Sequence, residues 1–213
     1  MEALTVQIGP EADDPLPWNA TLILYASYAR LAIETTFLEE GFCHSNGPSA
    51  FRGLKLMYSH FDLSKVDVRS IRNALTGFTG VIHRGIKFLS QTAPWSRSLE
   101  HAIGGFYSAV FLVTWIRCVE DKPGQMTFKE VEILDQLRIA LEEGDVHIYP
   151  ESLAATVVRA CMQLMERVWI WGITPLMGEV FRLYAEDILG SRAATMDVDP
   201  VVLEDEQRSE YGD

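Results

Sequence analysis

Apolar positions along residues 18–190 recur mostly at the spacing of an α-helix. The clearest run starts at Asp67, after which apolar residues follow at steps of three and four: Ile71, Leu75, Phe78, Ile82, Ile86 and Leu89. No stretch alternates apolar and polar residues for long enough to form a strand, and the one ambiguous segment, DVHIYP at 145–150, is short. The pattern predicts an all-α, single-domain bundle of about seven helices.

Two of the predicted helices carry almost no charge over several turns. The first runs through the stretch WNATLILYASYARLAIETTFLEE to Glu40, and the second contains the uncharged run from Ala102 to Ile116. Such runs would leave a large apolar patch if they faced water, so we expect the helices at 20–40 and 99–118 to be the most buried. The uncharged run has 15 residues, fewer than the about 20 that cross a bilayer, so no membrane is expected as a partner.

Capping residues and helix breakers mark the ends of the other helices. Thr127 and Glu130 have the spacing of a capping box, and Thr174 can cap the last helix with Pro175 at its first position. Pro150 opens the helix before it. These signals predict further helices over residues 49–61, 67–91, 96–120, 127–144, 150–172 and 174–190.

Charge is unevenly distributed and divides the chain into three parts. Residues 1–17 hold four acids and no base, residues 18–190 form the helical domain, and residues 191–213 hold seven acids against two arginines. Most of the net charge of −12 therefore lies in an acidic N-terminal arm and in an acidic tail whose composition predicts disorder. Because no basic stripe offsets these acids, we expect no direct contact with nucleic acid.

Catalytic and cofactor motifs are missing from the sequence. It contains no G-x-S-x-G, no phosphate-binding G-x-x-x-x-G-K-[ST] and no H-E-x-x-H. The three cysteines lie far apart, and no two of the five histidines share a helix face at i, i+4 spacing: Cys43, Cys118, Cys161, His44, His60, His83, His101 and His147. We therefore expect neither a metal nor a cofactor. Since no secretory signal is visible, the cytoplasm is the expected location.

Three polar side chains stand inside apolar helical stretches. His83, in FTGVIHRGIKF, is either a core histidine with satisfied nitrogens or a general base or hydrogen-bond donor to a ligand carbonyl. Arg159 and Gln163 lie four residues apart, so they share a helix face that is either solvated or, in a helix buried all round, directed into a cavity. We expect an apolar cavity to which these three residues supply the polar contacts.

Four aromatic residues extend this hypothesis to the wall of the cavity. Tyr107 and Trp115 lie in the uncharged helix, and Tyr25 and Tyr28 lie in the first helix. Aromatic residues at helical spacing are either ordinary core or part of a ligand site, and their buried polar atoms need partners in both cases. We expect Tyr107, Trp115 and one of Tyr25 or Tyr28 to bind the substrate.

The later part of the helical domain resembles a known regulatory family. The stretch YPESLAATVVRACMQLMERVWIWGITPLMGEVFRLYAEDILG resembles the C-terminal end of the fungal-specific transcription factor domain, with a helix ending in VWIWGITP and the next starting PLMGEV. Upstream, SLEHAIGGFYSAVFLVTWI resembles the aliphatic-rich helix in the middle of that domain. The resemblance spans about residues 18–190 and implies an all-helical regulatory domain.

In that family the helical domain normally follows a Zn2Cys6 DNA-binding cluster. Such a cluster needs cysteines gathered in a short basic N-terminal segment, whereas this chain begins with acids and disperses its three cysteines. We therefore expect the helical domain to stand alone, without the part that reads DNA.

Two classes of function follow from the resemblance. In the first, which better explains the uncharged, glycine-bearing helices, the domain is a cofactor-free cyclase or isomerase of fungal secondary metabolism. Enzymes of this kind catalyse Diels–Alder reactions by folding a flexible polyketide or terpenoid substrate in an apolar pocket, and here Arg159, His83 and Gln163 would polarise its carbonyl. In the second, the protein is a nuclear regulator without DNA contact that dimerises with or titrates a full-length family member. In either class of function the chain can form a homodimer.

Overall fold

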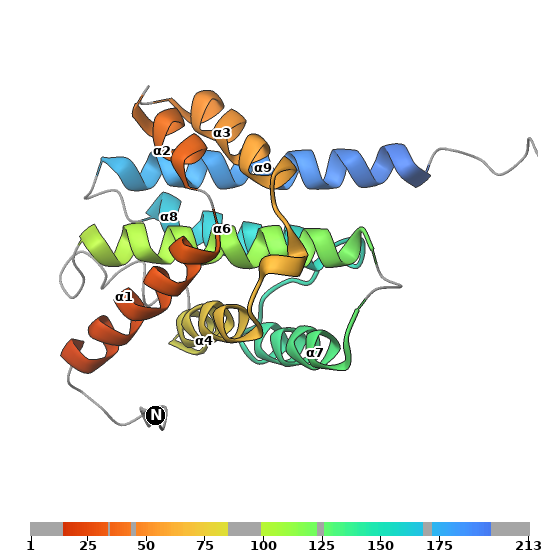
Figure 1. The fold of residues 1–213 in the computed structure, drawn as a ribbon, viewed down its shortest axis with the longest axis horizontal. Coiled ribbons are helices and arrows are strands. Elements are labelled where there is room, and N and C mark those ends of the chain that lie inside the picture. Colours follow the sequence, from red (N-terminus) through yellow and green to blue (C-terminus); the bar gives the residue numbers. More distant parts are fainter. Residues whose placement is uncertain are drawn as a thin grey trace, which may run out of the picture.

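The computed structural model describes residues 15–33, 35–43, 46–84, 99–122, 126–167 and 172–196. Within these ranges the regular elements are helices and no strand occurs, so the prediction of an all-α single domain is confirmed (Figure 1). The helices are α1 (Pro15–Ala32), α2 (Thr36–Cys43), α3 (Gly47–Ser59), the short 3-10 helix η1 (Leu63–Lys65), α4 (Val68–Arg84), α6 (Leu99–Glu120), α7 (Phe128–Glu143), α8 (Leu153–Arg167) and α9 (Ile173–Met196).

Helix α6 is the centre of the fold. It contacts α1, α4 and α8, and it crosses the middle of the molecule in Figure 1. Every residue from Phe106 to Ile116 is buried, as the absence of charge from this run predicts. The segment Ala102–Glu120 is long and apolar enough to cross a membrane, but 61% of it is buried inside the protein, as in the core helix of a globular domain.

The first predicted helix is two helices. The chain leaves helical geometry after Ala32, in a run rich in β-branched residues, and α2 starts at Thr36. The carbonyl oxygen of Thr35 accepts from the backbone N–H groups of Leu38 and Glu39, at 3.0 and 2.9 Å, which opens the new helix. The hydroxyl of Thr35 also donates to Glu39 Oε1 at 2.9 Å, so Thr35 ties the start of α2 together.

The burial expected for residues 20–40 is wrong for α1. Helix α1 contacts α6 and α4, and its residues Ala26 and Ala29 are buried, as is Ile33 just past its end. Its opposite side is open to solvent, and Leu24 and Leu31 are 54% and 85% exposed. Absence of charge identifies a core helix only when neighbours are available to cover every side, and α1 lies at the edge of the bundle.

Helices α2 and α3 pack closely because two glycines lie at their crossing. A Cβ on Gly41 would come within 2.6 Å of the Cα of Ala50, and a Cβ on Gly53 would collide with the backbone carbonyl of Phe37. The side chain of Asn46 accepts from the N–H of Ser49 at 2.8 Å and so caps α3, which begins two residues earlier than the predicted residue 49. Helix α3 then contacts α9.

The remaining helix ends agree in part with the signals in the sequence. Thr127 and Glu130 form the predicted capping box. Helix α8 begins at Leu153 rather than at Pro150, and α9 continues past Gly190 to Met196 because one exposed glycine in a helix costs only about 1 kcal/mol. The arm before residue 15, most of the tail, the predicted continuation of α4 to residue 91 and the predicted start of the next helix at residues 96–98 lie outside the described residues.

The crossing of α2 and α3 predicts opposite effects for two Gly→Ala substitutions. Gly53→Ala should lower the free energy of unfolding by about 1–3 kcal/mol, because the new methyl group meets backbone that cannot move aside. Gly105→Ala, in α6, should raise it by about 0.5–1 kcal/mol, because its Cβ meets nothing within 4 Å and alanine favours the helix. Urea denaturation followed by circular dichroism measures both, and equal effects would contradict the close crossing.

Candidate functional site

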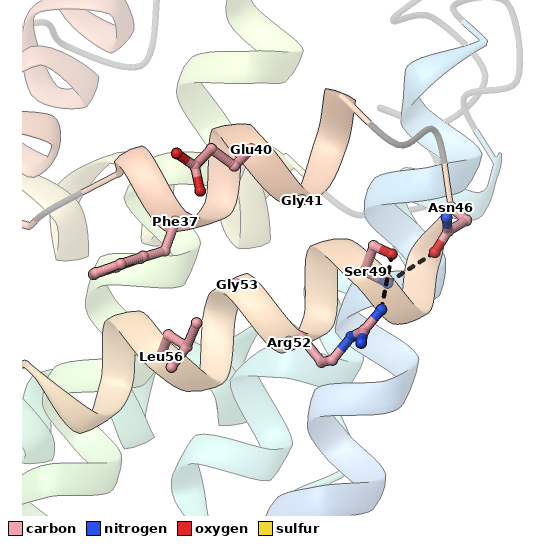
Figure 2. A pocket seen from close by; sticks show the side chains of 8 residues that line it. All are labelled: Phe37, Glu40, Gly41, Asn46, Ser49, Arg52, Gly53 and Leu56. Carbon is pink, nitrogen blue, oxygen red and sulfur yellow. Dashed lines mark hydrogen bonds between the residues drawn. The ribbon is translucent and has the colours of Figure 1, made fainter.

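A groove between α2 and α3 is one of the pockets in the described part of the chain. Its volume is about 520 Å³, and Figure 2 shows the side chains around it. Helix α2 contributes Phe37, Glu40 and Gly41, and the α3 segment contributes Asn46, Ser49, Arg52, Gly53 and Leu56. The groove therefore runs along the glycine crossing, since Gly41 and Gly53 both line it.

The groove offers charge at its middle and apolar surface at one end. Arg52 Nη2 donates to Ser49 Oγ at 3.3 Å, which lays the guanidinium along α3 (Figure 2). Leu56 is 49% exposed, and the ring of Phe37 stacks on that of His60 at 5.5 Å between centroids. An acid, a base and an exposed leucine in an open groove suit a segment of another protein better than an enclosed small substrate.

The second pocket lies where α6 ends beside α7 and the start of α8. Its volume is about 380 Å³, and the buried residues Val119, Leu134 and Leu153 line it together with the exposed Arg138. The carboxylate of Glu120 is committed there, because Oε1 accepts from the N–H groups of Leu153 at 2.6 Å and Ala154 at 3.4 Å. Glu120 therefore caps α8, and its carboxylate occupies the position at the helix N-terminus where an anionic ligand would otherwise bind.

A charged cluster joins α3, α6 and α9. Asp187 accepts from Arg117 Nη1 at 2.9 Å and from Lys55 Nζ at 2.8 Å. The side chains of Arg117 and Asp187 are only 12% and 17% exposed. Arg117 also lies over the ring of Tyr58, 4.4 Å from its centroid, and 5.5 Å from that of Tyr184.

Burial and charge act in opposite directions on the carboxyl group of this cluster. Burial alone would raise the pKa of Asp187, but the hydrogen bonds and positive charges of Lys55 and Arg117 outweigh it, so the pKa lies below its ordinary value. Burial raises the pKa of Tyr184 to about 12, so that phenol is neutral. The cluster thus holds the charged carboxylate of Asp187 between two cations from two other helices.

The three polar residues of the sequence hypothesis are divided between two helices, His83 on α4 and the other two on α8. His83 is exposed at the end of α4, with Nε2 3.3 Å from Glu143 Oε2, and is therefore not a core histidine. Arg159 donates from Nη1 to the hydroxyl of Tyr149 at 2.9 Å and covers that ring at 4.6 Å. Gln163 is exposed on the next turn of α8.

The four aromatic residues of the hypothesis are likewise divided between two helices, α1 and α6. Tyr107 is buried and donates to Glu39 Oε1 at 3.3 Å beneath the guanidinium of Arg30. Trp115 is 0% exposed, and its indole N–H has no hydrogen-bond partner in the described part of the chain. Tyr25 and Tyr28 are partly exposed on α1. None of the seven predicted residues lines either pocket described above, and the site assignment stays a prediction.

Sequence reasoning did not identify the groove or the charged cluster. Lys55 and Asp187 are 132 residues apart, so no spacing rule connects them. The groove had a weak signal, because Gly41 and Gly53 flank a turn between two apolar stretches and can mark a close helix crossing.

The fold of the described residues defines a class: an all-helical domain packed around one central helix. The sequence from residue 63 to residue 183 matches the family described as the fungal transcription factor C-terminal domain. This match runs from η1 into α9 and covers more than half of the chain, so the chain belongs to that family. Helices α1 to α3 precede the matched residues. Neither the curated proteins nor the solved structures gave a match.

The charged cluster predicts an unequal response to two substitutions in α9. Asp187→Asn should lower the free energy of unfolding by about 2–3 kcal/mol, less than for a fully buried pair, because it leaves Arg117 nearly buried without its counter-charge. Glu186→Gln removes an exposed pair with Arg182, at 57% and 45% exposure, and should change it by at most about 0.5 kcal/mol. Chemical denaturation at neutral pH compares the two, and a similar small loss for both would show that the cluster is not stabilising.

The same carboxyl group predicts a pH dependence. Since the pKa of Asp187 is lower in the folded than in the unfolded protein, its contribution is complete above the unfolded value of about 3.9 and is lost as the pH falls through the folded value. The stability difference between the wild type and Asp187→Asn should therefore be constant from about pH 7 to pH 5 and shrink below about pH 4. Denaturation curves across that range measure it, and a difference that shrinks on raising the pH would have the wrong sign.

Proposed function

We propose that the chain is a regulatory domain of fungal transcription that works by binding another protein. The observation that carries this proposal is membership of the fungal transcription factor C-terminal domain family over residues 63–183. The matched helices include the core helix α6 and all of its contacts with α4 and α8. The matched residues therefore contain the central helix and two of its packing partners, which can hold interaction surfaces in place.

The charge distribution supports a protein partner over DNA. The chain has a net charge of −12. Many of the basic side chains in the described residues are paired with carboxylates: Arg30, Lys55, Lys65, Arg72, Arg117, Arg138 and Arg182. Binding to a phosphate backbone would have to break these pairs while acidic surface repels the DNA.

The surface supports the same conclusion. The groove between α2 and α3 is open, and large apolar side chains are exposed on α1 and α7. Exposed apolar surface of this kind marks protein contacts in stable domains. The cyclase expected from the sequence is not proposed, because the geometry around Arg159, His83 and Gln163 offers no observation in its favour.

A tethering experiment tests the regulatory role. Fused to a heterologous DNA-binding module in a fungal host, the domain should localise to the nucleus and change the expression of a reporter at least about threefold, a shift of roughly 0.7 kcal/mol in recruitment. Arg52→Glu, which reverses charge in the groove, should reduce the effect, whereas Arg182→Glu, at a residue that does not line the groove, should not. A fusion that is folded and nuclear but leaves the reporter unchanged would overturn the proposal.

Direct DNA binding provides a separate test. The isolated chain should bind mixed-sequence duplex DNA with a dissociation constant weaker than about 100 µM at physiological salt, the weak end of non-specific binding. Fluorescence anisotropy over a salt series measures this. Tight binding with a steep salt dependence would show that a basic surface exists despite the acidic balance of the chain.

A further inference from the structure

We propose that two copies of this chain associate through the outer face of α1, packed antiparallel around a two-fold axis. Two seams run along α1. The inner seam consists of Ala26, Ala29 and Ile33, which are buried against the bundle. The outer seam consists of Ala20, Leu24, Ser27 and Leu31, and all four are exposed.

The outer seam has the spacing of a helix-pairing surface. Its four residues follow at steps of four, three and four, which is the repeat that keeps one stripe of a helix against a partner helix. Ile23, at 45% exposure, widens the apolar strip beside Leu24 at 54% and Leu31 at 85%. The hydroxyl of Ser27 donates to the carbonyl oxygen of Ile23 at 2.9 Å, so its polar group is satisfied without water.

The sizes of these residues select a second copy and an antiparallel direction. Small and large residues alternate along the seam: alanine, leucine, serine, leucine. In an antiparallel pair centred between Tyr25 and Ala26, Leu24 lies opposite Ser27 of the other copy and Leu31 lies opposite its Ala20. Every layer then holds one large and one small side chain and fills evenly. A parallel pair would stack leucine on leucine and leave gaps at the small residues.

Charge also favours α1 over the other exposed apolar surface. The 18 residues of α1 include one charged side chain, Arg30, which is paired within its own chain to Glu39 at 2.6 Å. The exposed apolar residues of α7, Phe128 and Ile139, lie beside the exposed Asp135 and Glu142. A second copy that packed on α7 would have to cover these charged side chains, whereas the outer seam of α1 contains no charged residue.

The contact is small, so the dimer should be reversible. A helix of 18 residues is about 27 Å long, and one helix pair buries an area at the low end of specific interfaces. We expect a dissociation constant of roughly 10 µM, on that estimate. The inference is independent of the proposed regulatory role, because it concerns how two copies meet and not what they do to transcription.

Sedimentation equilibrium across a concentration series tests the association. The wild type should pass from 24.0 kDa at low concentration to twice that mass at high concentration. Leu24→Glu should weaken the dimer at least about tenfold, by placing a carboxylate in the seam. Ile139→Glu, at a site with the same 54% exposure in α7, should leave it unchanged. Thermal melts of both variants show whether the fold is retained.

Disulfide trapping tests the direction of pairing. In a Cys43→Ser background, which removes the exposed native thiol, a mixture of Leu24→Cys and Ser27→Cys chains should crosslink with diamide as the oxidant. Each variant alone should crosslink at least about fivefold less, because the antiparallel register offsets identical positions by three residues. Stronger crosslinking of each variant with itself would establish a parallel pair and overturn the proposed geometry.

The outcomes separate this inference from the regulatory proposal. A wild type that stays monomeric at all concentrations overturns the dimer, and coverage of α1 by another segment of its own chain or by a different protein would produce that result. If a tethered Leu24→Glu domain still regulates the reporter, the regulatory proposal stands and does not depend on the dimer. If the wild type is dimeric but leaves the reporter unchanged, the dimer proposal stands and the regulatory proposal is overturned.

Discussion

The burial of α6 is the constraint on which the rest of this fold depends. Every side chain from Phe106 to Ile116 is buried. Each side of this part of α6 therefore needs a neighbouring helix to shield it from water. Helices α1, α4 and α8 provide direct contacts, and Phe181 of α9 reaches Phe106 with 4.9 Å between ring centroids. The other helices are then positioned by those that touch α6.

The polar end of α6 fixes how those neighbours are oriented. Within one turn, Arg117 reaches Asp187 on α9 and Glu120 accepts from the first N–H groups of α8. Apolar packing alone would allow the helices to slide, since it is not directional. Arg117 and Glu120 make short hydrogen bonds to different helices, and these bonds specify how the helices are aligned along α6. Asp187, the partner of Arg117, also binds Lys55 of α3.

The proposed interaction surfaces lie away from this centre. The groove between α2 and α3 and the outer seam of α1 both precede residue 63, where the match to the fungal transcription factor C-terminal domain begins. The matched helices supply most of the hydrophobic core, and the earlier helices complete one side of it while presenting apolar surface outward. Such a division lets contacts with partners change without disturbing the residues that bury α6.

The sequence by itself determined the helical class, the burial of α6 and the capping box at Thr127, because helical period, absence of charge and cap spacing are local properties of the chain. It did not determine the break between α1 and α2, nor that α1 lies at the edge of the bundle. An apolar helix has the same sequence pattern at the centre of a bundle and at its edge. His83 and Trp115 share an apolar setting in the sequence, yet one is exposed and the other buried. Only the tertiary structure decided which helix faces have neighbours, and it brought Lys55, Arg117 and Asp187 together, because contacts between distant residues depend on how the helices pack around α6.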